Sequence, residues 1–484
     1  MKVKLLFNLD LSDRLVVAEA RNFLFNYLFA RHHHGQLMLR LDALPEQEAS
    51  FSTFQELVRW IGIDLDAEQE ADKTRPIRRS ERLPDYSAYA HKLIEKHLAY
   101  RCFCSRETLR DMTNAQKIHG QTPRYDQRCL RISGPDRENL LAKGTPYQIR
   151  LRKPEVVSEV HDLVRGRMVF DTNDVADLII LRYDGTPGTA LANVVDHHLL
   201  GITHVMRGDR HKAETPREAF LRQAFDLKSP EYVHLPLILG EDRSLLSERH
   251  GDKYFDEYRS RGYMPDALLN YLLEHGLNRP VEEQPVLRSL GQMIKLFKLD
   301  DVQLNPSIWQ VEKLNDLNRK ALEKFKDDAL AQLLAPYVAK EGHDLYARGD
   351  AWAREFVAAI RPSLKTLSDV KESVEIFFAD KITPDKKGQT LLKDPDAKKV
   401  VETLEAAIEK VSNVTSDNYR DLLDAARSSV AAKSKALMVI RVSLTGREIG
   451  PDFVNLFSLL GKQRLLSRLE NARRYIPKGM KKES

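Results

Sequence analysis

The chain has 484 residues, of which 42% are hydrophobic and 30% charged, and its formal net charge is +5. This length predicts about two to four domains, and the slight basic excess permits a polyanionic partner without requiring one. No apolar run approaches the ~20 residues of a membrane helix, which excludes a membrane-spanning protein, and Asp10 and Asp13 directly after the first apolar patch argue against a signal peptide. Three cysteines, an odd and sparse number, argue against a disulfide framework and favour a reducing compartment, so we expect a cytoplasmic protein.

The first elements predict a doubly wound α/β domain. Residues 13–34 have the spacing of an amphipathic helix, and residues 37–41 alternate as a short strand. Residues from about 75 to 190 differ from this pattern, because they carry the cysteines, turn residues and several short strands. These strands are expected at 147–151, 167–170 and 178–181. The segment is therefore interpreted as an insertion in the α/β domain.

The second part of the chain predicts a helical region. The α/β pattern resumes with a strand at residues 202–206, and from about residue 254 onward the spacing of apolar residues is helical. Helices are expected at 267–274 and 310–326, and nearly continuously up to residue 474.

Several short segments resemble the bacterial-type glutamyl-tRNA synthetase family, a group of class I aminoacyl-tRNA synthetases. They occur in the order that the family has and are distributed over nearly the whole chain. They are residues 20–31, 78–82, 100–104, 123–126, 192–196, 201–208, 234–240, 267–272 and 440–448. One such segment alone would be weak, but their number and order leave little room for chance.

The resemblance implies a multidomain fold of an α/β and an all-α part. A Rossmann-type class I synthetase catalytic domain is expected in two halves, at residues 1–75 and 191–253. A connective insertion at 76–190 would bind the acceptor end of tRNA. A stem-contact region at 254–325 and an all-helical anticodon-binding region at 326–484 would follow.

The first nucleotide motif of this family is degraded in the chain. Activation of an amino acid needs fixed donors and cations that face the phosphates of ATP. The family supplies some of them with a His-Ile-Gly-Gly turn, whose positions are here Val16, Val17, Ala18 and Glu19. The imidazole and both glycines are lost, and Glu19 adds a negative charge where the triphosphate would lie. The favoured interpretation is that Val16, Val17 and Ala18 are ordinary helix and core residues.

The second nucleotide motif is also altered. The family's Lys-Leu-Ser-Lys-Arg-His-Gly loop corresponds to residues 245–251. Both lysines are replaced, by Leu245 and Glu248, the latter a reversal of charge. The remaining matches are Ser247, Arg249, His250 and Gly251. Loss of one transition-state donor typically costs ~10²–10³ in rate, so weak or absent ATP binding is expected.

The amino-acid pocket changes in the same way. The family's substrate arginine, serine and tyrosine fall on Leu6, Asp10 and Thr189, while Asn193 and Arg207 remain. Arg207 suits a substrate carboxylate, and it equally suits a structural role in which Asp196 or Asp209 is its partner. At position 210 the family's acid is replaced by Arg210.

The insertion carries a metal-site pattern seen in some members of the family. Cys102, Cys104, Tyr125 and Cys129 match it, and three thiolates with one oxygen suit structural zinc. The alternative is three reduced cysteines packed in a small core.

Two regions are expected to contact tRNA. Within the insertion, the candidates are Arg78, Arg79 and Arg82, with a solvated basic face as the alternative. Near the end of the chain, the resemblance implies that Arg441, Pro451 and Phe453 lie against the anticodon loop, where exposed bases favour a guanidinium beside an aromatic platform. The alternative places Phe453 in the core and Arg441 on the surface.

Three functions follow from these features. The first is a monomeric tRNA-binding paralogue that has lost or altered aminoacylation. The second is an enzyme repurposed for another tRNA-linked substrate. The third is an active glutamate–tRNA ligase, which must explain how the lost motifs became dispensable.

Overall fold

The computed structural model describes residues 2–9, 14–42, 48–65, 75–152, 158–170, 177–247, 249, 253–278 and 286–477. The chain divides into two compact units. Unit 1 comprises Met1–Arg259 and Pro265–Leu314, and unit 2 comprises Ser260–Met264 and Asn315–Ser484. No described helix is long and apolar enough to cross a membrane.

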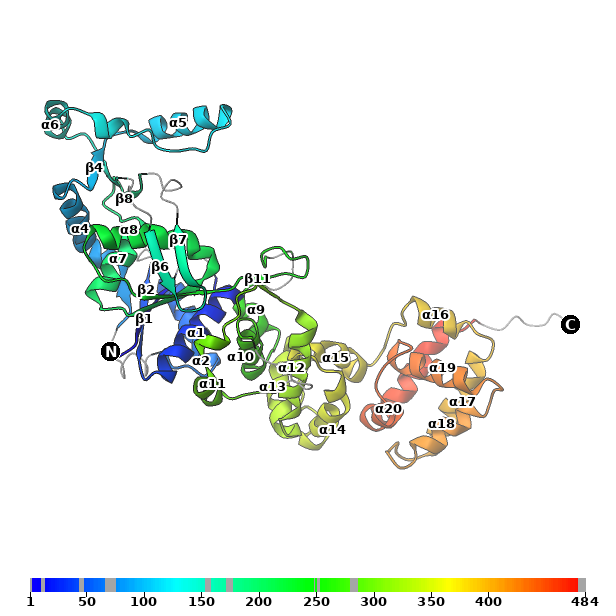
Figure 1. Cartoon of the computed structure of the whole chain (residues 1–484). Coiled ribbons are helices and arrows are strands. Elements are labelled where there is room, and N and C mark those ends of the chain that lie inside the picture. The colour runs from blue at the N-terminus through cyan, green and yellow to red at the C-terminus, as the bar shows by residue number, and fades with distance from the viewer. Residues whose placement is uncertain are drawn as a thin grey trace. The chain divides into compact units, whose positions relative to one another are not determined.

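Unit 1 is built on a twisted, mainly parallel sheet (Figure 1). Among the described residues, seven strands form it in the order β3-β2-β1-β9-β10-β6-β7. Their bounds are β1 Lys4–Leu9, β2 Gln36–Leu41, β3 Ile77–Arg78, β6 Ser158–Asp162, β7 Gly166–Phe170, β9 His204–Gly208 and β10 Glu231–Leu235. All neighbours pair in parallel except β6 and β7, which form an antiparallel hairpin at the edge. The order of the first five strands is that of a Rossmann sheet, as expected.

Helices accompany the strands of the sheet, and the sequence predicts the first of them. α1 (Val17–His32) follows β1 and is buried over most of its length, which fits a helix packed on several sides. The remaining helices of the α/β part are α2 Glu48–Trp60, α7 Thr189–Leu199 and α8 Thr215–Ala224. The expected helix at 13–34 and the strands at 37–41 and 202–206 correspond to α1, β2 and β9.

A smaller antiparallel sheet forms within the insertion. It has the order β4-β5-β8, with β4 Ala99–Cys102, β5 Gln148–Leu151 and β8 Ile179–Leu181. Its helices are α4 Leu83–Glu95, α5 Arg106–Ile118 and α6 Gly134–Ala142. α5 and α6 bury no residue and extend beyond β4 (Figure 1).

The hairpin β6–β7 differs from the expectation. Residues 158–170 look like part of the insertion in the sequence, yet Asp162 of β6 pairs with Tyr232 of β10 in the main sheet. Short strands carry little signal about which sheet they join, because that depends on pairing with distant segments.

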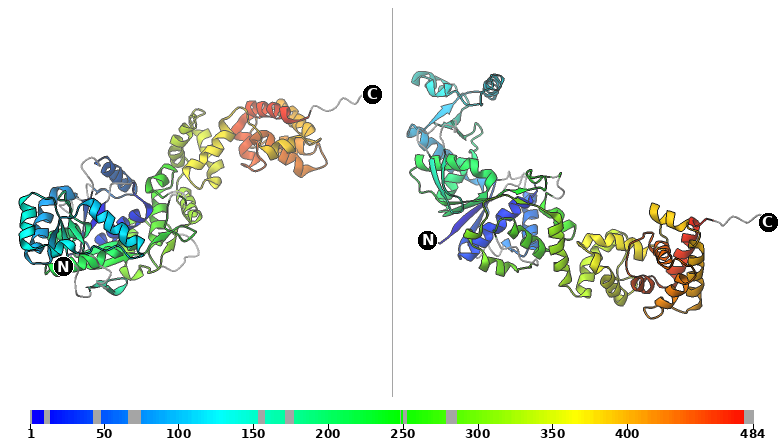
Figure 2. Two further views of the ribbon diagram at one scale, coloured as in Figure 1. Left: turned by 90° about the horizontal axis from the view of Figure 1, so that it is seen from above. Right: turned by 45° about the vertical axis from the view of Figure 1, so that its right-hand side comes forward.

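Helices dominate the rest of the chain. Unit 1 ends with the elements α9 Phe255–Ser260, α10 Pro265–Glu274, α11 Leu290–Leu296 and the pair β11 Ile238–Leu239 with β12 Ser307–Ile308. α12 (Val311–Glu323) follows. The helices of unit 2 are α13 Asp327–Lys340, α14 Asp350–Ile360, α15 Val370–Phe378, α16 Lys386–Leu392, α17 Ala397–Lys410, α18 Tyr419–Arg427, α19 Lys433–Thr445 and α20 Phe453–Ala472. Both views of Figure 2 show α17 to α20 gathered into one bundle, whose apolar faces form a common core.

Candidate functional site

The crevice of unit 1 lies where neighbouring strands of the main sheet connect in opposite directions. β1 and β9 are adjacent and parallel, and their carboxyl ends lead into α1 and into the short helix Asp209–Glu214. In open α/β sheets, ligands bind at this switch point. We call this region the crevice.

The degraded turn at 16–19 is part of the packed start of α1. Val17 is completely buried, and its backbone N–H donates to the Lys253 carbonyl over 3.0 Å. Val16 is extended and forms a bridge with Tyr254. An N–H at the start of a helix is a natural donor to phosphate, but this one already has a protein partner. Val17 is thus a buried helix residue and Ala18 a half-buried one, whereas Val16 lies just before the helix in an extended, half-buried position.

Glu19 forms an ion pair with Arg210 across the crevice. The Glu19 Oε1 and Arg210 nitrogen are 2.7 Å apart, although the residues lie on α1 and on the segment after β9. The Asn22 amide donates to the same carboxylate over 3.4 Å. In the family pattern, position 19 is glycine and position 210 is acidic. Both charges that look unfavourable in the sequence therefore neutralise each other.

The approach of α1 to β9 leaves no space here. A Cβ atom added at Gly208 would lie 2.9 Å from the Asn22 side-chain nitrogen. Next to it, burial lowers the pKa of His211 to about 4, with Arg210 and Arg207 as additional causes. His211 is therefore neutral at pH 7, and its Nε2 accepts from Arg210 over 2.9 Å.

Arg40 is the centre of a second charged network in the crevice. It lies on β2 and is fully buried. Its guanidinium donates to Asp42 over 2.7 Å, to Asp196 over 2.9 Å and to the side-chain amide oxygen of Asn193 over 2.8 Å. Burial opposes its charge, but the two carboxylates outweigh this and raise the pKa of Arg40. Arg40 is not among the site residues that the sequence predicts, because the residues next to it in the chain do not indicate which distant acids it contacts.

Asn193, which the sequence retains from the family pocket, is fully engaged in this network. Besides Arg40, its amide oxygen accepts from Asn8, and its amide nitrogen donates to Glu218 over 2.7 Å. Tyr86 donates to Asp196 over 2.8 Å. The network thus joins β1, β2, α4, α7 and α8.

Arg207 takes the structural alternative, with a different partner than expected. It pairs with buried Glu218 over 2.7 Å and donates to Thr215 over 2.8 Å. Burial works against a charge on Glu218, but Arg207 and neighbouring cations hold the pKa of Glu218 at about 2. The two acids that the sequence suggested are engaged elsewhere: Asp196 with Arg40, and Asp209 with Arg165 over 3.1 Å. Glu218 is eleven residues further along the chain and on another element, so the sequence gave no reason to choose it.

The altered loop at 245–251 is only partly described. Leu245 is 60% exposed, and Arg249 pairs with Asp242 over 3.2 Å. Ser247 lies between them in the chain. Glu248, His250 and Gly251 lie outside the described residues.

The three insertion arginines are placed differently from one another. Arg78 is on β3 with 38% of its side chain exposed. Arg79 donates to the Pro187 carbonyl, and Arg82 pairs with Asp196 over 3.2 Å. Arg79 and Arg82 therefore extend the crevice network, and tRNA contact by any of the three stays a prediction.

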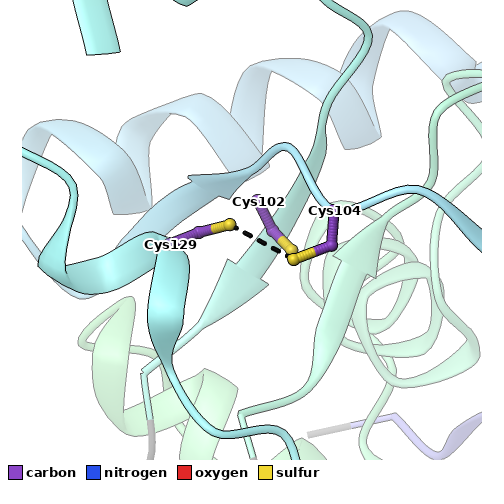
Figure 3. A group of neighbouring side chains, drawn as sticks. All are labelled: Cys102, Cys104 and Cys129. Carbon is purple, nitrogen blue, oxygen red and sulfur yellow. Dashed lines mark hydrogen bonds between the residues drawn. The ribbon is translucent and has the colours of Figure 1, made fainter. Parts of the chain in front are cut away.

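The cysteines of the insertion converge on one centre (Figure 3). Cys102 is the last residue of β4, Cys104 lies two residues later, and Cys129 lies in the short helix Arg128–Arg131. All three are buried, and their sulfurs lie within 4.8 Å of one another. The Cys104 and Cys129 sulfurs are 3.4 Å apart. Two sulfurs on a tetrahedral zinc ion, each at ~2.3 Å, would be roughly 3.7 Å apart, so the donor set fits such an ion.

Tyr125, the fourth residue of the predicted metal site, lies beside the cysteines, and its role as a ligand stays a prediction. Its hydroxyl lies 3.4 Å from the sulfurs of Cys102 and Cys104. Hydrogen bonding to Cys129 lowers the pKa of the Cys102 thiol. Buried Arg150 stacks 3.9 Å from the centre of the Tyr125 ring. Three thiolates with a divalent cation carry one net negative charge, which this guanidinium would balance.

The residues expected at the anticodon surface of unit 2 lie together. The Arg441 guanidinium is 4.4 Å from the centre of the Phe453 ring, and it donates to the carbonyls of Gly450 and Pro451. Phe453 is half-buried and also packs on the core of unit 2. The Phe453 ring therefore contacts both the core and the Arg441 guanidinium, and contact of this group with the anticodon loop stays a prediction.

Comparison with known families gives two matches in chain order. Residues 12–316 match the family described as "tRNA synthetases class I (E and Q), catalytic domain", and residues 329–473 match "Anticodon binding domain". Together they span nearly the whole chain.

The relatives among characterised proteins match from end to end. Glutamate–tRNA ligase 1 of Caldicellulosiruptor saccharolyticus is 32% identical over 480 residues, which cover 97% of this chain and 99% of that protein. Glutamate–tRNA ligase of Bacillus subtilis is 30% identical over 471 residues, covering 95% and 97%.

Solved structures agree with these matches. A glutamate tRNA ligase from Elizabethkingia meningosepticum, crystallised with its amino acid, superposes with a TM-score of 0.80 at 25% identity and covers 98% of this chain and 99% of its own. Glutamate-tRNA synthetase from Elizabethkingia anophelis, at 24% identity and a TM-score of 0.81, has the same fold and covers 98% of this chain and 100% of its own.

Proposed function

Because the chain belongs to the class I (E and Q) tRNA synthetase family, we propose that it binds tRNA without activating glutamate with ATP. The observation that carries this proposal is the Glu19–Arg210 ion pair at the start of α1. Because the replaced residues stabilise each other, the pair favours a crevice that no longer binds ATP over an active site with unusual motifs.

Among the described residues, the groups in the nucleotide half of the crevice that could bind phosphate already have protein partners. A triphosphate needs cations and N–H groups with no better partner. Arg210 is paired with Glu19, the Val17 N–H donates to the Lys253 carbonyl, and the Glu19 carboxylate would repel phosphate. ATP binding here would first have to break these contacts.

The amino-acid half is closed by its own charges. Glutamate would need a cation for each carboxylate, and the two arginines at hand, Arg40 and Arg207, already pair with buried acids. Freeing Arg207 would leave buried Glu218 without its ion-pair partner, which costs about 3–5 kcal/mol, whereas Asp196 would keep Arg82 and Tyr86 if Arg40 were freed. A bound glutamate would have to offset this cost.

Binding of tRNA rests on other parts of the chain. The match to the anticodon-binding family at residues 329–473, and the Arg441–Phe453 stack within it, support an RNA-binding surface. A guanidinium over an aromatic ring is a common platform for an unstacked base.

An active glutamate–tRNA ligase is the second candidate. It is favoured by the end-to-end similarity to ligases and by the presence of Asn193 and Arg207. In this case tRNA would have to rearrange the crevice before ATP and glutamate bind.

The deciding measurement is release of AMP from ATP with total tRNA and all amino acids present. We expect no release that depends on tRNA and one amino acid, while the ligase of Bacillus subtilis, assayed in parallel, is active. Such release from this protein would establish the ligase instead. Calorimetry adds a second criterion, because an ATP affinity on the order of micromolar, ~8 kcal/mol, would contradict the closed crevice.

We further propose that Cys102, Cys104 and Cys129 hold a structural zinc ion, with Tyr125 as the fourth ligand. A closed shell of three thiolates and one oxygen leaves no position for a substrate, which is the arrangement of structural sites. Elemental analysis of protein purified without chelator should give about one zinc per chain. Little or no zinc would leave the cysteines as packed thiols.

A further inference from the structure

One face of the small sheet in the insertion is polar although it is buried. β4 and β5 pair so that Tyr100 lies opposite Arg150 and Cys102 lies opposite Gln148. Because side chains alternate between the two faces of a strand, these four point to the same side of the sheet. The exposed fractions of Gln148 and Arg150 are only 3% and 6%. The cysteine centre lies on this face, since Cys102 belongs to it.

The opposite face of the same two strands is apolar. Ala99 of β4 and Ile149 and Leu151 of β5 pack in a hydrophobic core with Leu93 of α4. The apolar face therefore anchors the sheet in the fold, and the polar face has another role. A buried guanidinium is costly unless a negative charge or hydrogen bonds compensate it.

The partners of Arg150 point to the cysteine centre. Among the described residues, no carboxylate lies within ion-pair distance of Arg150, and its Nε atom has no hydrogen-bond partner. Its guanidinium donates to the backbone carbonyl of Asp177 over 2.9 Å. It also lies 3.9 Å from the centre of the Tyr125 ring, whose hydroxyl is 3.4 Å from the sulfurs of Cys102 and Cys104. One side chain thus separates this buried cation from the thiol cluster.

Asp177 ties the same group to the segment that carries two of the expected ligands. It is buried, and its carboxylate accepts from the Tyr100 hydroxyl and, over 3.1 Å, from the Gln127 amide. Gln127 has a φ of +61°, a left-handed conformation that is uncommon for residues other than glycine. It lies midway between Tyr125 and Cys129, so the turn that Asp177 holds brings these two side chains to one centre.

We infer that Arg150 and Gln148 are positioning residues of the metal centre, which stabilise three thiolates around a divalent cation. This inference rests on the proposed zinc site. Three thiolates and one divalent cation leave a net negative charge, which Arg150 offsets from the face of the Tyr125 ring. Gln148 donates to the Cys102 sulfur over 3.7 Å and fixes its direction. Loss of such partners behind the ligands typically lowers metal affinity by about 10- to 100-fold.

The main test is the zinc affinity of the full-length protein, measured in competition with a chromophoric chelator. Arg150→Met should lower this affinity by about 10- to 100-fold. The matched control is Arg152→Met, which removes an exposed arginine two residues further along with the same change in net charge. Arg152 donates to the His97 carbonyl and not to the cysteine centre, so the control should retain the affinity of the wild type.

Two further variants separate the charge from the hydrogen bond. Arg150→Lys keeps the positive charge and should recover most of the affinity that Arg150→Met loses. Gln148→Leu removes one neutral donor, so its affinity should fall less, by below about tenfold. An affinity of Arg150→Lys as low as that of Arg150→Met would contradict the role of the charge, and a wild-type affinity of Gln148→Leu would contradict the role of the amide.

Cobalt(II) in place of zinc distinguishes positioning from a purely structural role. The charge-transfer absorption between thiolate and cobalt reports how many sulfurs bind the metal. In Arg150→Met saturated with cobalt, this absorption should equal that of the wild type, because the cysteines remain together and only the affinity falls. Loss of affinity together with loss of this absorption would overturn the inference, since Arg150 would then only hold the fold.

The remaining outcomes separate this inference from the zinc site on which it rests. If the wild-type protein holds no zinc, the proposed zinc site fails and this inference fails with it. If the wild type holds zinc while Arg150→Met equals Arg152→Met in affinity, the zinc site stands and the role of Arg150 is overturned.

Discussion

The crevice of unit 1 and the cysteine centre of the insertion have opposite electrostatic designs. In the crevice, each charged side chain at the switch point faces a charge of the other sign, as Glu19 faces Arg210 and Arg40 faces Asp196. In the insertion, three groups of one kind converge on a common point. Charged side chains that already form ion pairs with one another do not require a ligand for stability. Three thiolates, in contrast, are most stable when they coordinate a cation.

The paired charges also show how the charged residues at a switch point can change without loss of the fold. If only the cationic side chains of a binding site were replaced, the buried acids that pair with them would lose their partners, which costs free energy. In this chain the replacement of Gly by Glu19 and of an acid by Arg210 is mutually compensating.

Removal of Arg40 should have the largest effect on stability. Arg40→Met leaves Asp196 and Asp42 without the guanidinium between them, and we expect a loss of about 3–5 kcal/mol in the free energy of unfolding. Denaturant titration measures it. The control Arg167→Met breaks an exposed pair with Glu159 and should leave stability unchanged within error. A loss below about 1 kcal/mol for Arg40→Met would mean that the network is dispensable.

Removal of one thiol should abolish the metal centre. Cys129→Ser should reduce bound zinc from about one to less than about 0.2 per chain and destabilise the insertion, because two thiolates rarely retain the ion. Tyr125→Phe is the milder comparison, since water replaces a tyrosine oxygen more readily than a sulfur. Full zinc content in the serine variant would assign the metal to other ligands.

A buried histidine of unit 1 offers a pH-dependent test of packing. Among the described residues, neither ring nitrogen of His275 has a hydrogen-bond partner, and the ring packs against Tyr271 and Trp309. Burial, with Arg21 as a further cause, lowers the pKa of His275 to about 3. His275→Phe should stabilise the fold by about 1 kcal/mol at pH 7, because two unpaired polar atoms leave the core.

The stabilisation by His275→Phe should be larger at acidic pH. The pKa of the folded state lies below the ordinary value of 6.5, so the unfolded chain takes up a proton first as pH falls through 6.5. The wild type therefore loses stability between pH 6.5 and about 3, by ~1.4 kcal/mol per unit, and the variant does not. At pH 5 the difference should be about 2 kcal/mol larger than at pH 7. An equal gain at both values would show that His275 titrates normally.

The Glu19–Arg210 pair should contribute least to stability. Arg210 is half-exposed, so a double-mutant cycle with Glu19→Gln and Arg210→Gln should give a coupling of about 0.5 kcal/mol that shrinks in high salt. A coupling near zero would separate the two charges energetically. The pair would then act only on ligands, by excluding phosphate.

The sequence predicted much of this molecule because its signals were local. Spacing within one segment identified α1, β2 and β9. The resemblance to the family pattern pointed to Cys102, Cys104, Tyr125 and Cys129, of which the structure brings the three cysteines together. The same reading assigned the degraded turn at Val16 and Val17 to helix and core. It also pointed to the Arg441, Pro451 and Phe453 group.

Only the tertiary structure decided the charge partners. Arg40 meets Asp196, 156 residues away, because β2 is next to β1 in the sheet and α7 packs beside them. Strand order likewise places Arg207 next to Glu218 rather than next to Asp196 or Asp209. It also places the hairpin β6–β7 beside β10 in the main sheet. Periodicity and motif order are properties of neighbouring residues, so a sequence determines them by itself. Ion pairs between distant segments depend on strand order and side-chain direction, which exist only after the chain has folded.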